Sequence, residues 1–179
     1  VAEYKGKIGT TEYGNMLVSV ATEYNNALLV VENANIGWAS IQVALDKGYS
    51  NLYYSPKGDG ATSAEAFLQK GYDVMDRSKM VPGFTMSLKT RPLVIGKLDA
   101  YMREKSIIIQ CKRTMEELRT FIWRSGRPEA QLGYNDDLVM SLATSCYVRD
   151  TALKFAQQGL DITKATLSNW SRSAPAIYS

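Results

Sequence analysis

The sequence contains no histidine, and this absence excludes a large share of enzyme chemistry. Without histidine there is no Ser-His-Asp or Cys-His nucleophile system, no HExxH zinc site and no imidazole for general acid–base catalysis. An enzyme built from this chain must work with carboxylates, lysines, tyrosines or metal ions held by oxygen ligands.

The sequence also has few cysteines and a small net charge. The two cysteines, Cys111 and Cys146, lie far apart and show no CxxC spacing, which favours buried thiols in a reducing compartment over a disulfide. Lys and Arg number 21 against 18 Asp and Glu, a net charge of +3. This surplus is too small to indicate nucleic-acid binding unless the charges cluster locally.

Long hydrophobic runs are missing as well. No segment approaches the roughly 18 apolar residues of a membrane helix, and the first residues lack the layout of a secretion signal. We therefore expect a soluble, unexported protein without membrane contact. With 179 residues, 45% hydrophobic and 22% charged, the chain has the length and composition of an ordinary globular domain.

Short apolar runs alternate with helical patterns, which predicts an α/β fold with a central sheet flanked by helices. We expect one domain over residues 1–157 and a flexible tail over residues 158–179. The predicted strands are a weak one at 1–9 and three apolar ones at 27–31, 52–54 and 107–109. The predicted helices cover 10–24, 38–47, 90–101, 114–123 and a long stretch from 136 past 148, and residues 55–85 are expected to form a loop.

Local signals mark several helix ends. Gly48 is predicted to end the second helix as a C-cap, and Thr90 to begin the third as an N-cap, with Pro92 in its first turn. The Thr114–Glu117 segment has the spacing of a capping box at the start of the fourth helix.

Two acidic positions are candidates for chemistry. Glu32 directly follows the apolar strand, at the sheet edge where ligand crevices form in open α/β folds. Asp136 and Asp137 stand at the start of the last long helix. One carboxylate there is explained by N-capping, but a helix needs one cap and adjacent carboxylates repel, so the second indicates another cause, such as a cation.

If these elements lie near each other, the carboxylates form a hard-oxygen site. Mg²⁺ and Mn²⁺ prefer such ligands and keep waters for substrate phosphates. Two such ions can activate water and stabilise the leaving oxygen of a phosphodiester, with no need for histidine.

Several motifs occur in the order known from one family. The 26–54 segment reads NALLVVENANIGWASIQVALDKGYSNLYY, and the 133–143 segment reads GYNDDLVMSLA; between them come Lys89-Thr90-Arg91-Pro92 and Glu117-Leu118-x-x-Phe121. Together they resemble the nuclease domain of large terminase subunits from tailed bacteriophages. The resemblance covers about residues 1–150, and the motifs are specific in combination although each is weak alone.

The resemblance implies an RNase H-like fold and a metal-dependent endonuclease that cuts concatemeric viral DNA during genome packaging. It assigns two of the family's three acidic positions, the second to Glu32 and the third to Asp136 with Asp137 beside it, as catalytic ligands of two Mg²⁺ or Mn²⁺ ions. The first position lies on an opening strand that precedes this sequence, so the first strands of the fold are absent here. Asn135 stands where the family frequently has histidine.

The resemblance also implies partners and a location. The partners are double-stranded DNA, the ATPase domain of the same large subunit, the portal protein and the small terminase subunit, in the host cell cytoplasm on the viral prohead. No G-x-x-x-x-G-K-[ST] motif occurs, so ATP hydrolysis is not expected of this chain.

Candidate DNA contacts are basic residues near loops or helix starts. Lys89 and Arg91 could bind a phosphate together with free backbone amides at a helix N-terminus, or could be solvated. Lys57 begins a flexible Gly-rich loop, 57–60, that could touch DNA. The pairs Lys112 with Arg113 and Arg124 with Arg127 are interpreted as solvated charges. Core-like spacing favours packing for the aromatic residues Trp38, Tyr53, Tyr54, Phe121 and Trp123.

Two alternatives stay open. Another RNase H-like nuclease, such as a Holliday-junction resolvase, shares the metal chemistry and differs in the shape of its substrate. A non-catalytic module that docks on DNA or on the portal would use the acidic pair only to cap a helix.

Overall fold

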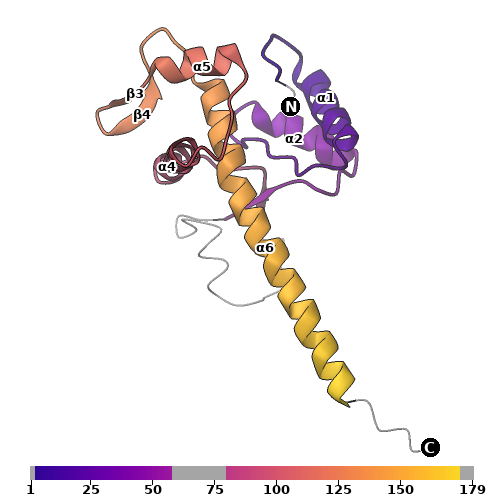
Figure 1. Ribbon diagram of the computed structural model, residues 1–179. Coiled ribbons are helices and arrows are strands. Elements are labelled where there is room, and N and C mark those ends of the chain that lie inside the picture. The colour runs from indigo at the N-terminus through magenta and orange to yellow at the C-terminus, as the bar shows by residue number, and fades with distance from the viewer. Residues whose placement is uncertain (1–2, 58–79, 174–179) are drawn as a thin grey trace, which may run out of the picture. The chain divides into compact units, whose positions relative to one another are not determined.

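The structure is a computed structural model that describes residues 3–57 and 80–173. In this part of the chain it is mixed α/β, with five helices and two small antiparallel sheets (Figure 1). The chain divides into two units, Val1–Pro92 and Leu93–Ser179. The predicted α/β class is therefore confirmed at this coarse level.

The first unit is built on two packed helices, α1 (Thr10–Glu23) and α2 (Gly37–Asp46). Gly14 of α1 allows their close approach, because a Cβ there would lie 2.7 Å from the Cβ of Val43. Gly48 has a φ of +65°, so the predicted C-cap of α2 is confirmed. Residues of both helices and of the bridged segments form a cluster of buried apolar side chains: Ala21, Leu29, Ile41, Ala44 and Leu52.

The predicted central strand at 27–31 forms isolated bridges rather than a continuous strand. Leu29 pairs in parallel with Leu52, and Glu32 pairs in parallel with Phe84. The chain from Leu29 through α2 to Leu52 is thus a short parallel crossover unit, which matches the predicted alternation. Strand β1 (Tyr54–Pro56) pairs antiparallel with β2 (Met80–Pro82), which lies in the region predicted as a loop. Residues 3–9 form no strand, contrary to the prediction.

Helix α4 (Thr90–Arg103) begins in the last residues of the first unit and continues into the second. Its cap is Ser87 rather than the predicted Thr90. The backbone N–H of Ser87 donates to Thr90 Oγ1 at 2.7 Å, and the N–H of Thr90 donates to Ser87 Oγ at 3.1 Å. This reciprocal pair is a capping box that begins three residues earlier than expected. Pro92 lies in the first turn, as predicted.

Two predictions for the second unit are wrong. Residues 107–109 form neither strand nor helix, and Ile108 is 82% exposed, so this apolar run has no sheet to join. The predicted helix at 114–123 is a shorter helix, α5 (Lys112–Arg119), followed by strand β3 (Phe121–Arg124). Strand β3 pairs antiparallel with β4 (Arg127–Ala130).

A two-residue turn closes this β3–β4 hairpin. Ser125 and Gly126 have φ values of +49° and +78°, the conformation of a type I′ turn, whose twist suits antiparallel strands. The β-branched and aromatic residues before the turn also favour a strand.

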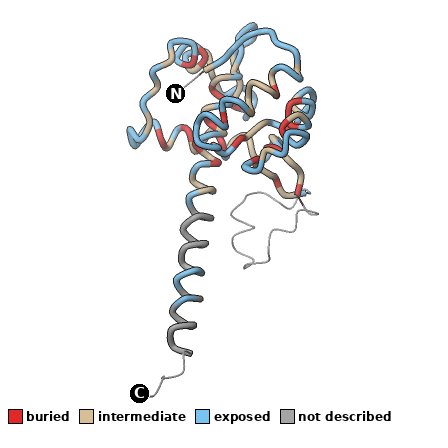
Figure 2. The backbone as a smooth tube through the Cα atoms, turned by 90° about the vertical axis from the view of Figure 1, so that its right-hand side faces the viewer, coloured by how far each residue is buried: buried red, intermediate tan, exposed pale blue. Residues whose placement is uncertain are grey.

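Helix α6 (Asp137–Ser173) confirms the predicted long helix and continues through residues 158–173, the start of the segment predicted as a flexible tail. Helix α5 packs against it. Figure 2 shows buried residues on the packed helices and mostly exposed residues on the connecting loops. Among the described residues, no helix has the length and apolar character needed to span a membrane.

Candidate functional site

Glu32 is exposed and lies at the end of the bridged segment of the first unit. The backbone on both sides of it is fixed. The N–H of Phe84 donates to the carbonyl of Val31 at 2.7 Å, and the N–H of Asn33 donates to the carbonyl of Phe84 at 2.9 Å. A Cβ at position 37 would collide with the Glu32 carbonyl oxygen, so Gly37 is required at this approach.

Asn33 is a residue of this site that the sequence reasoning missed. Its side chain is buried, and Nδ2 donates to the carbonyl of Pro82 at 3.2 Å and to Thr85 Oγ1 at 2.9 Å. Asn33 therefore ties the Glu32 segment to residues 82–85. The sequence signal for Asn33 was its amide side chain directly after the carboxylate of Glu32. The hydrogen-bond partners of Asn33 could not be found from the sequence, because they lie about fifty residues away.

Asp136 and Asp137 lie at the N-terminus of α6. Asp137 is the first helical residue, and the carbonyl of Asp136 accepts the N–H of Met140 at 2.8 Å, which makes Asp136 the N-cap residue by position. The helix dipole favours negative charge at this end. Asp137 is exposed and Asp136 is half-buried.

A third carboxylate, Glu117 of α5, performs the capping. Its Oε2 accepts the backbone N–H of Leu138 at 2.8 Å and of Val139 at 3.3 Å, and its side chain is buried. These are the amides that an N-cap side chain ordinarily accepts. The capping box predicted for Thr114–Glu117 is wrong, since α5 begins at Lys112 and Glu117 caps the next helix instead.

The predicted carboxylates belong to different units, Glu32 to the first and Asp136 with Asp137 to the second. Among the residues that the structure describes, no three or more acidic or cysteine side chains are grouped to hold a metal ion. The donor types nevertheless fit the expected ions, because carboxylates are hard oxygen ligands of Mg²⁺ and Mn²⁺. Glu32 comes from the first unit, and Asp136 with Asp137 comes from the second.

The predicted DNA contacts lie in the first unit. Lys89 is exposed immediately before α4, and Arg91 lies in its first turn. Ser87 accepts the backbone N–H groups of Lys89, Thr90 and Arg91, so the expectation of available amides at this helix start is wrong and a phosphate contact there relies on side chains. Lys57 is exposed, and residues 58–60 of its loop lie outside the described residues.

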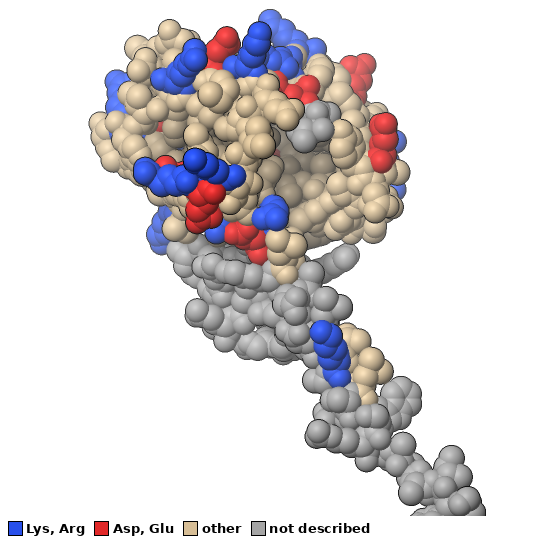
Figure 3. Space-filling model, viewed as in Figure 1, with Lys and Arg blue, Asp and Glu red and all other residues tan. Residues whose placement is uncertain are grey.

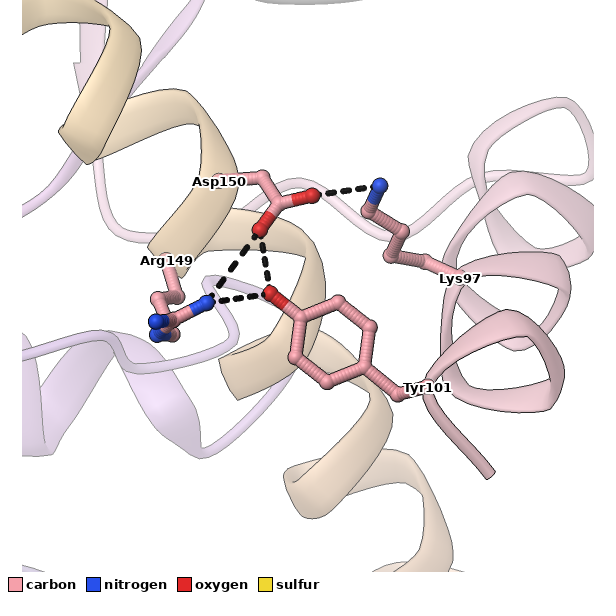
Figure 4. Close-up of polar contacts among 4 residues, drawn as sticks. All are labelled: Lys97, Tyr101, Arg149 and Asp150. Atoms are coloured by element: carbon pink, nitrogen blue, oxygen red, sulfur yellow. Dashed lines mark hydrogen bonds and ion pairs between the residues drawn. The ribbon is translucent and has the colours of Figure 1, made fainter. Parts of the chain in front are cut away.

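A polar network joins α4 to α6 within the second unit (Figure 4). Asp150 of α6 forms an ion pair with Lys97 and accepts a hydrogen bond from the hydroxyl of Tyr101, both on α4. Arg149 donates to the same hydroxyl at 2.6 Å.

The network shifts the pKa of its members. The hydrogen bond to Asp150 raises the pKa of Lys97 above its ordinary value. Burial favours the neutral form of Asp150, but hydrogen bonds from Lys97 and Tyr101 outweigh it and hold the Asp150 pKa below its ordinary value. The network thus stabilises charged groups at the α4–α6 contact.

Two aromatic predictions are wrong, and one thiol prediction is confirmed. Trp38 is 43% exposed and Trp123 is 65% exposed, so neither is a core residue. Cys146 is a buried free thiol, and burial raises its pKa. Cys111 is also free but only half-buried.

No protein-family model matches the chain, and no curated protein matches it.

Proposed function

We propose that this chain is the nuclease domain of a phage large terminase, an RNase H-like, metal-dependent endonuclease that cuts duplex viral DNA during packaging. The observation that carries the proposal is the arrangement at the start of α6. Glu117 accepts the Leu138 and Val139 amides, and Asp136 and Asp137 stand beside this cap as two adjacent carboxylates at the helix start. A carboxylate pair at that place fits a cation-binding role.

Glu32 supports the same function from the first unit. It follows a parallel-paired segment, and its backbone is held by the hydrogen bonds of Val31 and Asn33 to Phe84. A carboxylate on fixed backbone is suited to hold an ion in a defined position. No residue of this sequence is assigned to the family's first acidic position.

In this function Glu32, Asp136 and Asp137 would hold two Mg²⁺ or Mn²⁺ ions, which supply Lewis-acid activation of water and charge stabilisation at the phosphodiester. Lys89, Arg91 and Lys57 would bind DNA phosphates and position the duplex. The ATPase domain of the large subunit, the portal protein and the small subunit would complete the motor in the host cytoplasm.

The test is Mn²⁺ binding, measured by titration calorimetry, together with cleavage of linear duplex DNA. We expect Glu32→Ala and Asp136→Ala each to weaken Mn²⁺ binding about tenfold or more and to abolish any cleavage, with unchanged circular dichroism. Glu116→Ala is the matched control, because Glu116 is an exposed carboxylate beside Glu117. Full cleavage or full Mn²⁺ affinity in either variant would contradict the proposal.

The same measurements separate the alternatives. A resolvase would cut branched DNA in preference to linear duplex. A docking module would bind DNA or portal protein but show no Mn²⁺ affinity.

A further inference from the structure

The β3–β4 hairpin has a surface that its own packing does not explain. Arg124 and Arg127 are both exposed and stand directly opposite each other beside the turn. Like charges at directly opposed positions destabilise an antiparallel pair. Glu129 offsets this only in part, through an exposed ion pair of 3.9 Å with Arg124.

Trp123 adds an apolar group to this basic tip. It precedes Arg124 on β3, so alternation places the two side chains on opposite faces of the ribbon. Trp123 is 65% exposed, whereas its cross-strand neighbour Pro128 is fully buried. The hairpin therefore presents two arginines on one face at its tip and an exposed aromatic side chain on the other face, next to them.

Helix α5, which leads into the hairpin, is also rich in positive charge. Lys112, Arg113 and Arg119 are exposed on it, and Figure 3 shows blue side chains over α5 and at the edge of the hairpin. Of its two acidic residues, Glu116 is exposed and Glu117 is buried against the amides of α6. The exposed charge of α5 and the hairpin tip is therefore mainly positive.

The dimensions of the hairpin suit a nucleic-acid groove. Two paired strands lie about 4.8 Å apart, and the major groove of B-DNA, about 12 Å wide, admits a two-stranded ribbon. The two-residue turn keeps the tip narrow and defines the positions of the two arginines.

We propose that the β3–β4 hairpin is a duplex-DNA contact, in which Arg124 and Arg127 bind backbone phosphates and Trp123 packs against the sugars or base edges. The positive charge favours a polyanion over an apolar protein partner. The inference rests on the proposed function only in taking DNA as the ligand. It assigns a binding role to residues that the sequence pattern suggested were ordinary solvated charges and a core aromatic.

The test is the binding of the full chain to a fluorescein-labelled 30-base-pair duplex, measured by anisotropy in EDTA so that neither metal binding nor cleavage contributes. We expect the double variant Arg124→Gln with Arg127→Gln to weaken binding about tenfold or more at low salt. The slope of log affinity against log salt should become shallower by about 2, one for each lost phosphate contact. Trp123→Ala should weaken binding about fivefold or more, and Trp123→Phe should retain most of the affinity.

The matched control is Arg103→Gln with Lys105→Gln, which removes the same charge from exposed positions at the end of α4. Equal losses in the control and hairpin variants would overturn the proposal, since bulk charge would then explain them. Wild-type affinity in the hairpin variants would also overturn it and leave the nuclease proposal standing.

If the wild-type chain binds no duplex DNA, the hairpin proposal fails, while Mn²⁺ binding at Glu32 and Asp136 is decided separately. If the hairpin variants bind DNA normally but lose affinity for portal protein, the surface binds a protein instead of DNA, and the proposal is overturned.

Discussion

Glu117 illustrates how one side chain can organise a site without being part of it. Its carboxylate is buried and accepts two amides of α6, directly after the Asp136–Asp137 pair. Buried donors that lose their acceptor carry the full penalty of desolvation. Glu117 therefore holds the helix end on which the aspartates stand.

Removing this acceptor should destabilise the fold. We expect Glu117→Ala to lower the free energy of unfolding by about 1–3 kcal/mol, because one buried and one part-buried amide lose their partner. Glu117→Gln should lower the free energy of unfolding by less, since the glutamine side-chain oxygen can still accept the two amides. Urea denaturation measures both, and Glu116→Ala should change stability by less than about 0.5 kcal/mol. Equal stability of the Ala and Gln variants would contradict the capping role.

The contact between α4 and α6 depends on paired charges as well as on apolar packing. Lys97 and Tyr101 of α4 meet Asp150 of α6, and the buried Leu98 lies between them in sequence. Partly exposed ion pairs contribute modestly to stability, so the network adds to the packing rather than replacing it.

The pKa directions define the pH range in which this network acts. The Asp150 pKa is lowered in the folded protein, so its contribution is present above about pH 4 and disappears as the pH falls through the lowered value. The Lys97 pKa is raised, so its contribution is present below about pH 10 and disappears as the pH rises through the raised value.

Asp150→Asn should expose this dependence. We expect the variant to melt about 2–4 °C below wild type between about pH 5 and 9, and the difference to shrink below about pH 4. Asp99→Asn is the control, because Asp99 and Arg103 form an exposed ion pair within α4. A difference in melting temperature that persists unchanged at pH 2 would show that charge pairing is not the cause.

The division into two units has consequences for the entire chain. The first unit has its own buried cluster around Ile41, and the second has buried residues on α4 and α6, among them Val94 and Val139. Each contains one group of the predicted carboxylates. Each unit therefore has buried residues of its own that stabilise it.

Hydrogen exchange can test whether the units unfold separately. Ile41→Ala, which opens a cavity in the first core, should speed exchange in α1 and α2, and Val139→Ala should speed it in α5 and the first turns of α6. Each substitution should leave the amides of the other unit largely unchanged. Equal acceleration throughout the chain would show one cooperative unit instead.

Elements governed by neighbouring residues were predictable from the sequence. Helices α1 and α2 follow from local apolar spacing, Gly48 ends α2 because its positive φ suits glycine, and Pro92 fits a first helical turn. Elements that depend on distant partners were missed. The 107–109 run is apolar enough for a strand, but the structure pairs it with none, and Phe121–Trp123 join a strand because the Ser125–Gly126 turn brings β4 beside them.

The candidate site also has a part that the sequence predicts and a part that only the fold shows. Glu32, Asp136 and Asp137 could be selected from sequence because each adjoins an apolar strand or begins a helix, and both are local features. Only the fold assigned the α6 amides to Glu117 and linked Asn33 to Pro82 and Thr85. Those contacts join residues 21 to 52 positions apart, and buried hydrogen bonds over such separations follow from how elements pack, which no local pattern encodes.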